Sequence, residues 1–312
     1  MSIVSSLITS TCKSANSIVS PLFSIQKAHR TLIVRALKKL EDVIDLYILN
    51  PFMGPEGWFF DGAYGTLAED PLYGFKTLRQ LYLKADPGFE GRVTVPVLWD
   101  KKTATLVNNE SSEIIRMLAS QFDDLVPAPE LREANRPGGG LYPPHLRADI
   151  DALNEWVYRD VNNGVYRCGF AGTQEAYDEY VYPLFAALDR LEGIFEEHGK
   201  PFLLGESLTE ADVRLYTTVA RFDAAYHTVF LCNLKSIRHD YPHLNLWLRR
   251  LYWDRSELTS GGAFYNTTAP WIGTYAKGYS GSKDRISPGQ ANKIVPRGPA
   301  VPIEPLKDEE RL

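Results

Sequence analysis

Few residues in this sequence have the type and spacing that chemistry at a protein site requires. Three scattered cysteines (Cys12, Cys168 and Cys232) form no Cys-x-x-Cys pair and indicate no disulfide framework, which favours a reducing compartment. The six histidines show no His-Glu-x-x-His spacing, so we expect no metal site. The glycines at 138–140 are not followed by Lys-Ser or Lys-Thr, as a phosphate-binding loop would require. The chemistry must therefore come from residues that the fold brings together.

The first part of the chain alternates strands and helices. The patterns predict strands at 17–25, 45–50, 92–99 and 103–107, and helices at 28–44, 77–85 and from 109 onward. Asn109 is the expected cap of the last helix, with acidic residues in its first turn. Pro96 lies inside the strand at 92–99, and because a central strand does not tolerate proline, it should open an edge strand or a turn.

The rest of the chain has a helical period, with helices expected at 145–161, 174–198, 209–230 and 244–253. Thr209 to Asp212 forms a capping box with Asp in place of Glu, and Leu208 and Val213 are placed for a hydrophobic staple. The predicted organisation is a serine-rich leader (1–24), an α/β domain (25–123), a Pro/Gly-rich linker (124–142), a helical domain (143–255) and an ordered tail that keeps its aromatics (256–312).

The composition and net charge exclude several classes of protein. The 312 residues are 44% hydrophobic, which is enough for a sizeable core. A net charge of −5 argues against a nucleic-acid partner, and no apolar run reaches the length of a membrane span. Residues 1–24 lack both a long apolar centre and arginines, so they do not fit a targeting peptide, and we expect a cytoplasmic protein.

An α/β unit with a proline at its third strand, followed by a helical domain, resembles a glutathione transferase. The resemblance implies a thioredoxin-like half in which Pro96 is cis and the Val95 N–H and C=O pair with glutathione. It also implies that Glu110 and Ser111, at a helix start, hold the γ-glutamyl end of glutathione. The alternative for Glu110 and Ser111 is a plain helix cap.

Longer motifs resemble one class of this family, the Xi class of glutathionyl-hydroquinone reductases, which is related to the omega class. They run in order from about residue 28 to 300: Ala28-His29-Arg30, Gly57-Trp58, Leu141-Tyr-Pro143, Val161-Asn-Asn-Gly-Val-Tyr166, Leu208-Thr-Glu-Ala-Asp-Val-Arg214 and Ile294-Val-Pro-Arg-Gly-Pro299. The resemblance implies a homodimer that uses glutathione as co-substrate.

The same resemblance assigns further site residues. Trp58 would contact glutathione, or else belong to the core, and Arg92 would pair with the glycyl carboxylate or guard the strand end. Tyr142, Tyr166 and Tyr279 would surround an aromatic, quinone-like substrate, which tyrosine can both stack on and hydrogen-bond.

The sequence departs from the family at the nucleophile. The family motif is Cys-Pro-Trp-Ala-His-Arg, whereas this chain has Ile25-Gln26-Lys27 before Ala28-His29-Arg30, so the cysteine position is Ile25. In the family this thiolate attacks the sulfur of a glutathionyl-hydroquinone and keeps glutathione as a mixed disulfide, which a second glutathione releases. Cys168 and Cys232 are expected to be small buried hydrophobes.

Three explanations follow. The protein has lost thiol chemistry and Ser24 activates glutathione by hydrogen bonding; or it binds glutathione or an aromatic ligand without redox work; or residues 1–24 are an artefact of the gene model, since Phe23-Ser-Ile-Gln reads like translation across an intron end. The leading hypothesis is glutathione-dependent transfer or reductive deglutathionylation of quinone-like substrates. The alternative is a non-redox glutathione-binding homologue that serves specialised-metabolite biosynthesis.

Overall fold

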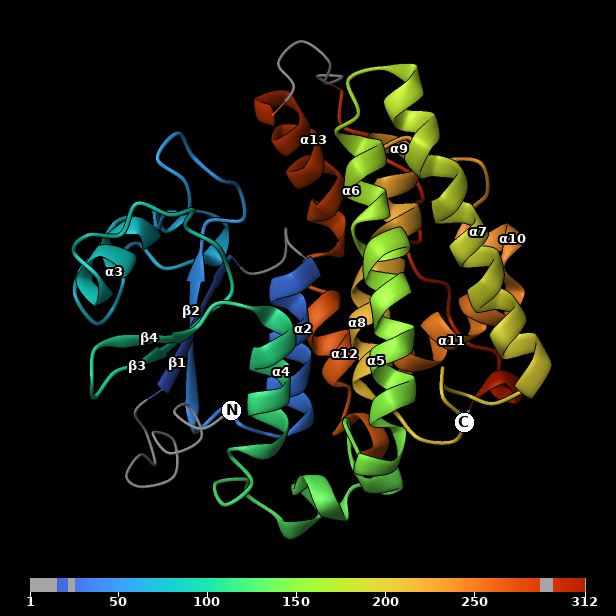
Figure 1. Ribbon diagram of the computed structural model, residues 1–312, viewed down its shortest axis with the longest axis horizontal. Helices are drawn as coiled ribbons and strands as arrows, with labels where there is room; N and C mark the ends of the chain where they lie inside the picture. The colour runs from blue at the N-terminus through green and yellow to red at the C-terminus, as the bar shows by residue number, and fades with distance from the viewer. Residues whose placement is uncertain (1–15, 22–25, 287–293, 312) are drawn as a thin grey trace. The chain divides into compact units, whose positions relative to one another are not determined.

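The computed structural model describes residues 16–21, 26–286 and 294–311 (Figure 1). Ser24, Ile25 and Cys12 lie outside the described residues, so the expectations for them stay predictions. The chain divides into two compact units, residues 1–136 and 137–312. In the described part of the chain, no helix is both long and apolar enough to cross a membrane.

The N-terminal unit is built on a four-stranded sheet in the order β2-β1-β3-β4. Strand β1 (Asn16–Pro21) runs parallel to β2 (Ile44–Leu49) and antiparallel to β3 (Val97–Asp100), which pairs antiparallel with β4 (Thr105–Asn108). This mixed sheet is the thioredoxin-like arrangement that the sequence predicted. The strand expected at 92–99 begins only at Val97, directly after Pro96, and the Val95–Pro96 peptide bond is cis. The expectation of an edge strand is wrong, because β3 pairs with both β1 and β4, and the proline is tolerated because it precedes the paired residues.

Three helices cover the two faces of this sheet. Helices α2 (Gln26–Leu37) and α4 (Ser111–Ser120) pack against each other on one face, and α3 (Leu78–Ala85) lies on the other (Figure 1). Between α3 and the sheet lies a cluster of buried apolar side chains: Leu49, Trp58, Phe60, Leu78, Leu81, Tyr82, Val95, Val97 and Trp99.

The helix predicted at 28–44 is wrong in its C-terminal part. Helix α2 ends at Leu37, Lys39 has a positive φ of 50°, and Ile44 already begins β2. Leu40 and Ile44 are nevertheless fully buried. The spacing of Leu40 and Ile44 therefore indicated that both residues are buried, but a buried residue can lie in a turn or a strand as well as in a helix.

The C-terminal unit is helical, with α8 at its centre: every residue of α8 is buried. The helices are α5 (Arg147–Trp156), α6 (Gly164–Gly169), α7 (Gln174–His198), α8 (Glu210–Arg221), α9 (His227–Val229), α10 (Ile237–Asp240), α11 (Pro242–Trp253), α12 (Ala263–Thr268) and α13 (Tyr275–Ile286). Two predicted helices, 145–161 and 209–230, are interrupted: the first is α-helical over α5 and continues as the π-helical segment η6 (Val157–Asn162), and the second has the π-helical segment η7 (Phe222–Tyr226) between α8 and α9.

The capping box at the start of α8 is confirmed, and its acid does more than cap. The buried Asp212 carboxylate accepts hydrogen bonds from the Thr209 N–H (3.0 Å) and hydroxyl (3.1 Å). It also accepts from the Leu203 N–H and the Trp247 Nε1–H, both at 3.0 Å. Burial raises the pKa of Asp212, and these four donors oppose that shift. Asp212 therefore connects α8 to α11 and to the turn that precedes α8.

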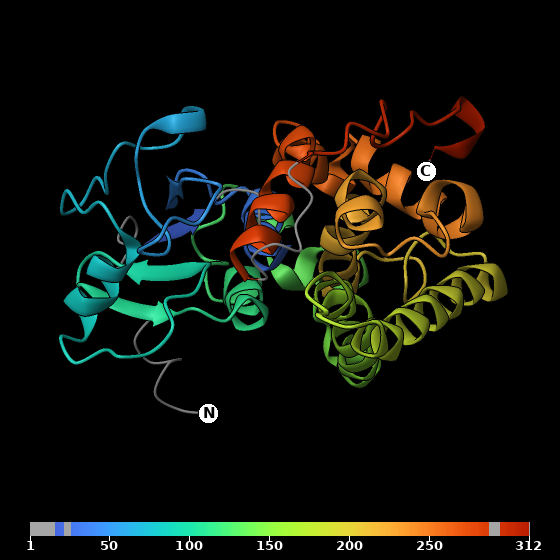
Figure 2. The ribbon, with the colours of Figure 1, turned by 90° about the horizontal axis from the view of Figure 1, so that it is seen from above.

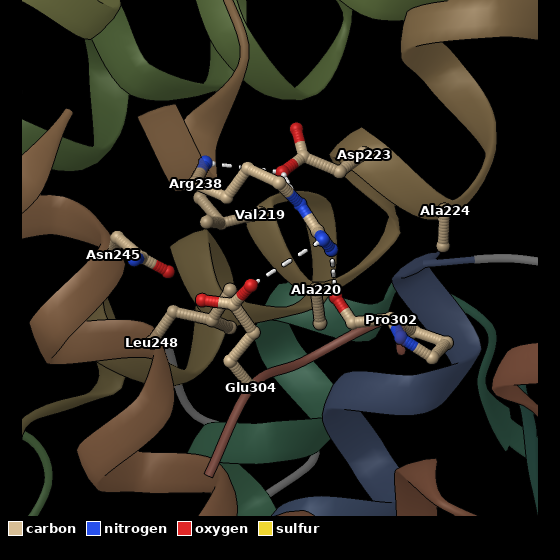
Figure 3. A pocket seen from close by; sticks show the side chains of 9 residues that line it. All are labelled: Val219, Ala220, Asp223, Ala224, Arg238, Asn245, Leu248, Pro302 and Glu304. Atoms are coloured by element: carbon tan, nitrogen blue, oxygen red, sulfur yellow. Dashed lines mark hydrogen bonds and ion pairs between the residues drawn. The ribbon is translucent and has the colours of Figure 1, made fainter. Parts of the chain in front are cut away.

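The chain's last described segment, residues 294–311, runs along the helical unit and is held mainly by α11 (Figure 2). Arg249 binds both carboxylate oxygens of Glu310, at 3.0 and 2.6 Å, and Trp253 Nε1–H donates to the Glu304 carbonyl at 2.8 Å. Arg238 lines a small pocket beside this segment, where it faces Asp223 at 3.3 Å and Glu304 at 3.7 Å (Figure 3).

The hold on this tail should weaken in acid. The hydrogen bonds from Arg249, followed by the Lys307 N–H, keep the pKa of Glu310 below its ordinary value. A depressed pKa contributes stability above the carboxyl's unfolded pKa of about 4.3, and the contribution is lost as pH falls through the lower folded value. Glu310→Gln should therefore lower the free energy of unfolding at pH 7 by up to about 1 kcal/mol and have no effect near pH 3. Thermal unfolding of both proteins across this range checks it, and a difference that is independent of pH would contradict it.

Candidate functional site

The start of α4 is the first part of the candidate site. Its N-cap is Glu110, whose carboxylate oxygen Oε1 accepts from the Ser112 N–H and from the hydroxyls of Ser111 and Ser112, each at 3.3 Å. The expectation that Asn109 caps this helix is wrong, because the Asn109 amide donates instead to Tyr82 Oη (3.1 Å) and Thr94 Oγ1 (3.0 Å).

The electrostatics of this helix start favour a charged carboxylate. Burial acts to raise the pKa of Glu110, but the Ser112 N–H, the charge of Lys27 and the two serine hydroxyls outweigh it, so the pKa of Glu110 lies below its ordinary value. Lys27 belongs to the first turn of α2, where the family motif has tryptophan. The positive N-terminal end of α4 and the Lys27 ammonium thus act on the same region, and this charge distribution suits an anionic group.

The loop before β3 is the second part. Val95 is 6% exposed, and its N–H and C=O make no hydrogen bond to any described residue. Pro96 is buried beside it. Backbone groups left open in this way can pair with an extended peptide, which is the role that the family resemblance implies for Val95 and which stays a prediction.

Trp58 and Arg92 have contrasting surroundings. Trp58 is 5% exposed and packs within the apolar cluster between α3 and the sheet. This is the core position that we gave as the alternative to a glutathione contact. Arg92 is exposed in the loop before Val95, and within the described chain it has no ion-pair partner. A role for either side chain in ligand binding stays a prediction.

In the helical unit, two of the three predicted tyrosines meet. The hydroxyls of Tyr166 (α6) and Tyr279 (α13) are 3.2 Å apart, and the Tyr226 hydroxyl lies 2.8 Å from that of Tyr279. Tyr142 is engaged elsewhere: its hydroxyl donates to Asp151 Oδ2 at 2.6 Å, and the Arg147 guanidinium lies over its ring. We call Tyr166, Tyr226 and Tyr279 the tyrosine cluster.

The tyrosine cluster supplies hydrogen-bond donors. Burial raises the pKa values of Tyr226 and Tyr279 well above the ordinary value, although the buried Arg221 cation opposes this, so both hydroxyls stay protonated at neutral pH. Arg221 itself donates to the Thr217 carbonyl at 2.7 Å and lies over the Tyr275 ring. A phenol hydroxyl can donate to the oxygens of an aromatic ligand, and in this cluster Tyr166 is the partly exposed member while Tyr226 and Tyr279 are buried.

The two described cysteines are confirmed as buried residues. Cys168 is 3% exposed and Cys232 is fully buried, and burial raises the pKa of Cys232 well above the ordinary value. Neither thiol is therefore suited to act as a thiolate nucleophile. Within the described residues, no three His, Cys, Asp or Glu side chains gather as a metal site would require.

Sequence reasoning missed Tyr226 and the contacts among Tyr82, Thr94 and Asn109. Tyr226 lies in a π-helical segment, and its partners Tyr166 and Tyr279 are 60 and 53 residues away in the chain. No local pattern signals such a meeting, because each of these tyrosines by itself reads as an ordinary core residue.

Comparison with known proteins agrees with this geometry. Family models of the glutathione S-transferase N-terminal and C-terminal domains match residues 27–121 and 174–250. The glutathionyl-hydroquinone reductase PcpF of Sphingobium chlorophenolicum is 45% identical over 288 residues, covering 91% of this chain and 83% of that protein. The chain belongs to the glutathione transferase family.

Comparison with solved structures identifies the class of this chain within the family. The glutathione S-transferase Xi of Phanerochaete chrysosporium is 46% identical, with a TM-score of 0.83 and coverage of 95% of this chain and 93% of that one. The Xi transferase ECM4 of Saccharomyces cerevisiae, crystallised with glutathione, is 37% identical with a TM-score of 0.83, and 95% of each chain is covered. Within its family, this protein is a member of the Xi class.

Proposed function

We propose that the N-terminal unit binds glutathione between the Val95 loop and the start of α4. The observation that carries this is the pairing of open Val95 backbone groups with a helix N-terminus at which Glu110, Ser111 and Lys27 meet. The complex of the yeast Xi transferase with glutathione supports it.

Each part of this site suits one part of the tripeptide. The Val95 N–H and C=O pair with the backbone of the cysteinyl residue, as one strand pairs with another. The Ser111 hydroxyl and the N–H groups of the first turn of α4 hold the γ-glutamyl carboxylate, and the Glu110 carboxylate accepts from its ammonium. Arg92, exposed in the same loop, pairs with the glycyl carboxylate.

We propose further that the second substrate is a quinone-like aromatic, bound at the tyrosine cluster. Its hydroxyls suit a ligand with oxygens at the ends of an aromatic ring, and the PcpF relative is named a glutathionyl-hydroquinone reductase. In the reaction of that class, a thiolate takes the glutathionyl sulfur, the hydroquinone leaves with the bonding electron pair and a proton, and a second glutathione then releases glutathione disulfide.

A second candidate function rests on the sequence at residue 25. Ile25 carries no group that can attack sulfur, and Cys168 and Cys232 are buried. The chain as written then has no cysteine nucleophile at this position: either Ser24 activates bound glutathione by hydrogen bonding, or the protein binds glutathione or an aromatic ligand without redox work. The comparisons do not support recruitment to a specialised-metabolite pathway. A homodimer and a cytoplasmic location stay predictions.

Glutathione binding should depend on Glu110. Glu110→Ala should weaken binding by about 1–3 kcal/mol, because the ligand's charged group loses its acceptor and the helix start loses its cap. Isothermal titration with glutathione measures this. Glu113→Ala is the matched control, since Glu113 is an exposed carboxylate in the same helical turn, bound by Asn108 at 2.6 Å. Equal affinity of the Glu110→Ala protein and the unaltered chain would remove Glu110 from the site.

A further inference from the structure

Tyr82 lies outside the proposed glutathione contacts, yet its hydroxyl is bound to both segments that make them. This α3 residue donates to the Thr94 carbonyl at 2.8 Å and accepts from the Thr94 N–H at 3.3 Å. It also accepts from the Asn109 amide at 3.1 Å. The same amide donates to Thr94 Oγ1 at 3.0 Å, which closes a three-residue network.

The partners of Tyr82 lie next to the two segments that we propose to bind glutathione. Thr94 directly precedes Val95, and Asn109 directly precedes Glu110. One phenol oxygen therefore fixes the peptide unit beside the open Val95 groups and the turn from which α4 begins. Asn108 adds to this, because its side-chain carbonyl accepts from the Glu110 N–H at 2.7 Å.

The tyrosine itself is held firmly. Tyr82 is 2% exposed and belongs to the apolar cluster between α3 and the sheet, and its ring packs on Phe89 with centroids 4.8 Å apart. A ring held in this way gives its hydroxyl little freedom. The two binding segments are thus tied to one rigid anchor, and the Asn109–Thr94 hydrogen bond also joins them to each other.

We propose that Tyr82, with Thr94 and Asn109, is a positioning residue that sets the distance between the Val95 backbone and the N-terminus of α4, and through it the affinity for glutathione. The inference rests on the proposed glutathione site. Hydrogen bonds weaken steeply when the donor–acceptor distance leaves the range of roughly 2.7–3.2 Å, so a ligand that bridges two segments is sensitive to their spacing.

The test removes one oxygen atom. Tyr82→Phe should raise the dissociation constant for glutathione about 5- to 30-fold in isothermal titration, because three polar groups lose their shared partner and the two segments drift apart. Tyr47→Phe is the matched control: it deletes the same atom from a β2 residue of the same unit, whose hydroxyl donates to Asp45 at 3.3 Å, and should leave the affinity unchanged.

A double-mutant cycle separates positioning from mere stabilisation. Asn109→Ala should raise the dissociation constant for glutathione as Tyr82→Phe does. In the double variant, the fold-increase should be much smaller than the product of the two single fold-increases, because both substitutions remove the same connection. If Tyr82→Phe does not fold, Asn109→Ala together with Thr94→Val takes its place, with the same expectation.

The outcomes are distinct. A Tyr82→Phe protein that melts earlier but binds glutathione as the unaltered chain does would overturn the positioning role and leave the proposed function intact. An unaltered chain that does not bind glutathione would overturn both. Weakened binding with multiplying effects of Tyr82→Phe and Asn109→Ala would show that the two residues act separately, which also contradicts the proposal.

Discussion

Restoring a cysteine before α2 is expected to switch on deglutathionylation. The triple variant Ile25→Cys, Gln26→Pro and Lys27→Trp should reduce a glutathionyl-hydroquinone on the order of 10³-fold faster than the unaltered chain, the scale on which loss of a nucleophile acts. In the unaltered chain the residue beside Ile25 in sequence that carries a nucleophilic group is Ser24, and an oxygen nucleophile cannot form the mixed disulfide that the second glutathione must resolve. Residue 25 directly precedes α2, whose N-terminus would lower the pKa of the new thiol.

The measurements are a glutathione-dependent assay on the glutathionyl-hydroquinone and mass spectrometry, which should find glutathione bound through the new cysteine. The matched control carries Ile25→Ser with the same two neighbouring changes and should stay inactive. If the unaltered chain already turns over this substrate, our assignment of the nucleophile position is wrong, and Cys12 is the first residue to replace. If the triple variant binds glutathione but stays inactive, the tyrosine cluster is not a quinol site and the non-redox function stands.

Replacing Asp212 is expected to have the largest effect on stability. A lost helix cap alone costs about 0.5–2 kcal/mol, which is what the sequence predicts. The structure adds the Leu203 and Trp247 donors to those of Thr209, all buried, so Asp212→Ala should lower the free energy of unfolding by about 3–5 kcal/mol. Chemical denaturation measures it.

Two comparisons sharpen this result. Thr209→Ala, which removes one donor and leaves the Asp212 contacts to Leu203 and Trp247 in place, should cost only about 0.5–2 kcal/mol. Glutathione affinity of the folded Asp212→Ala protein should be unchanged, because the proposed glutathione contacts all belong to the N-terminal unit. A protein with full stability but defective catalysis would show that Asp212 has a chemical role instead.

Local signals predicted some elements closely. Helix α7 begins and ends where expected, at Gln174 and His198, because its ends are marked by nearby residues: the Thr173 side chain accepts from the Ala176 N–H, and Gly199 adopts a positive φ of 59°. The capping box at Thr209 is of the same kind. Such features depend on a few adjacent side chains, so the sequence contains all the information they need. The strand predicted at 92–99, in contrast, is wrong in its first part and in its position, because only Val97–Asp100 forms β3 and β3 is internal in the sheet.

Of the candidate site, the residue types can be read from the sequence: a proline after Val95, a Glu-Ser pair at an expected helix start, and no cysteine at residue 25. The three-dimensional fold shows that Glu110 caps α4, whereas the Asn109 amide donates to Tyr82, 27 residues away. The fold likewise decided that Tyr226 completes the tyrosine cluster, whose members come from separate helices. Local patterns show which residues are buried or capped, whereas the partner that each one finds depends on packing between distant segments.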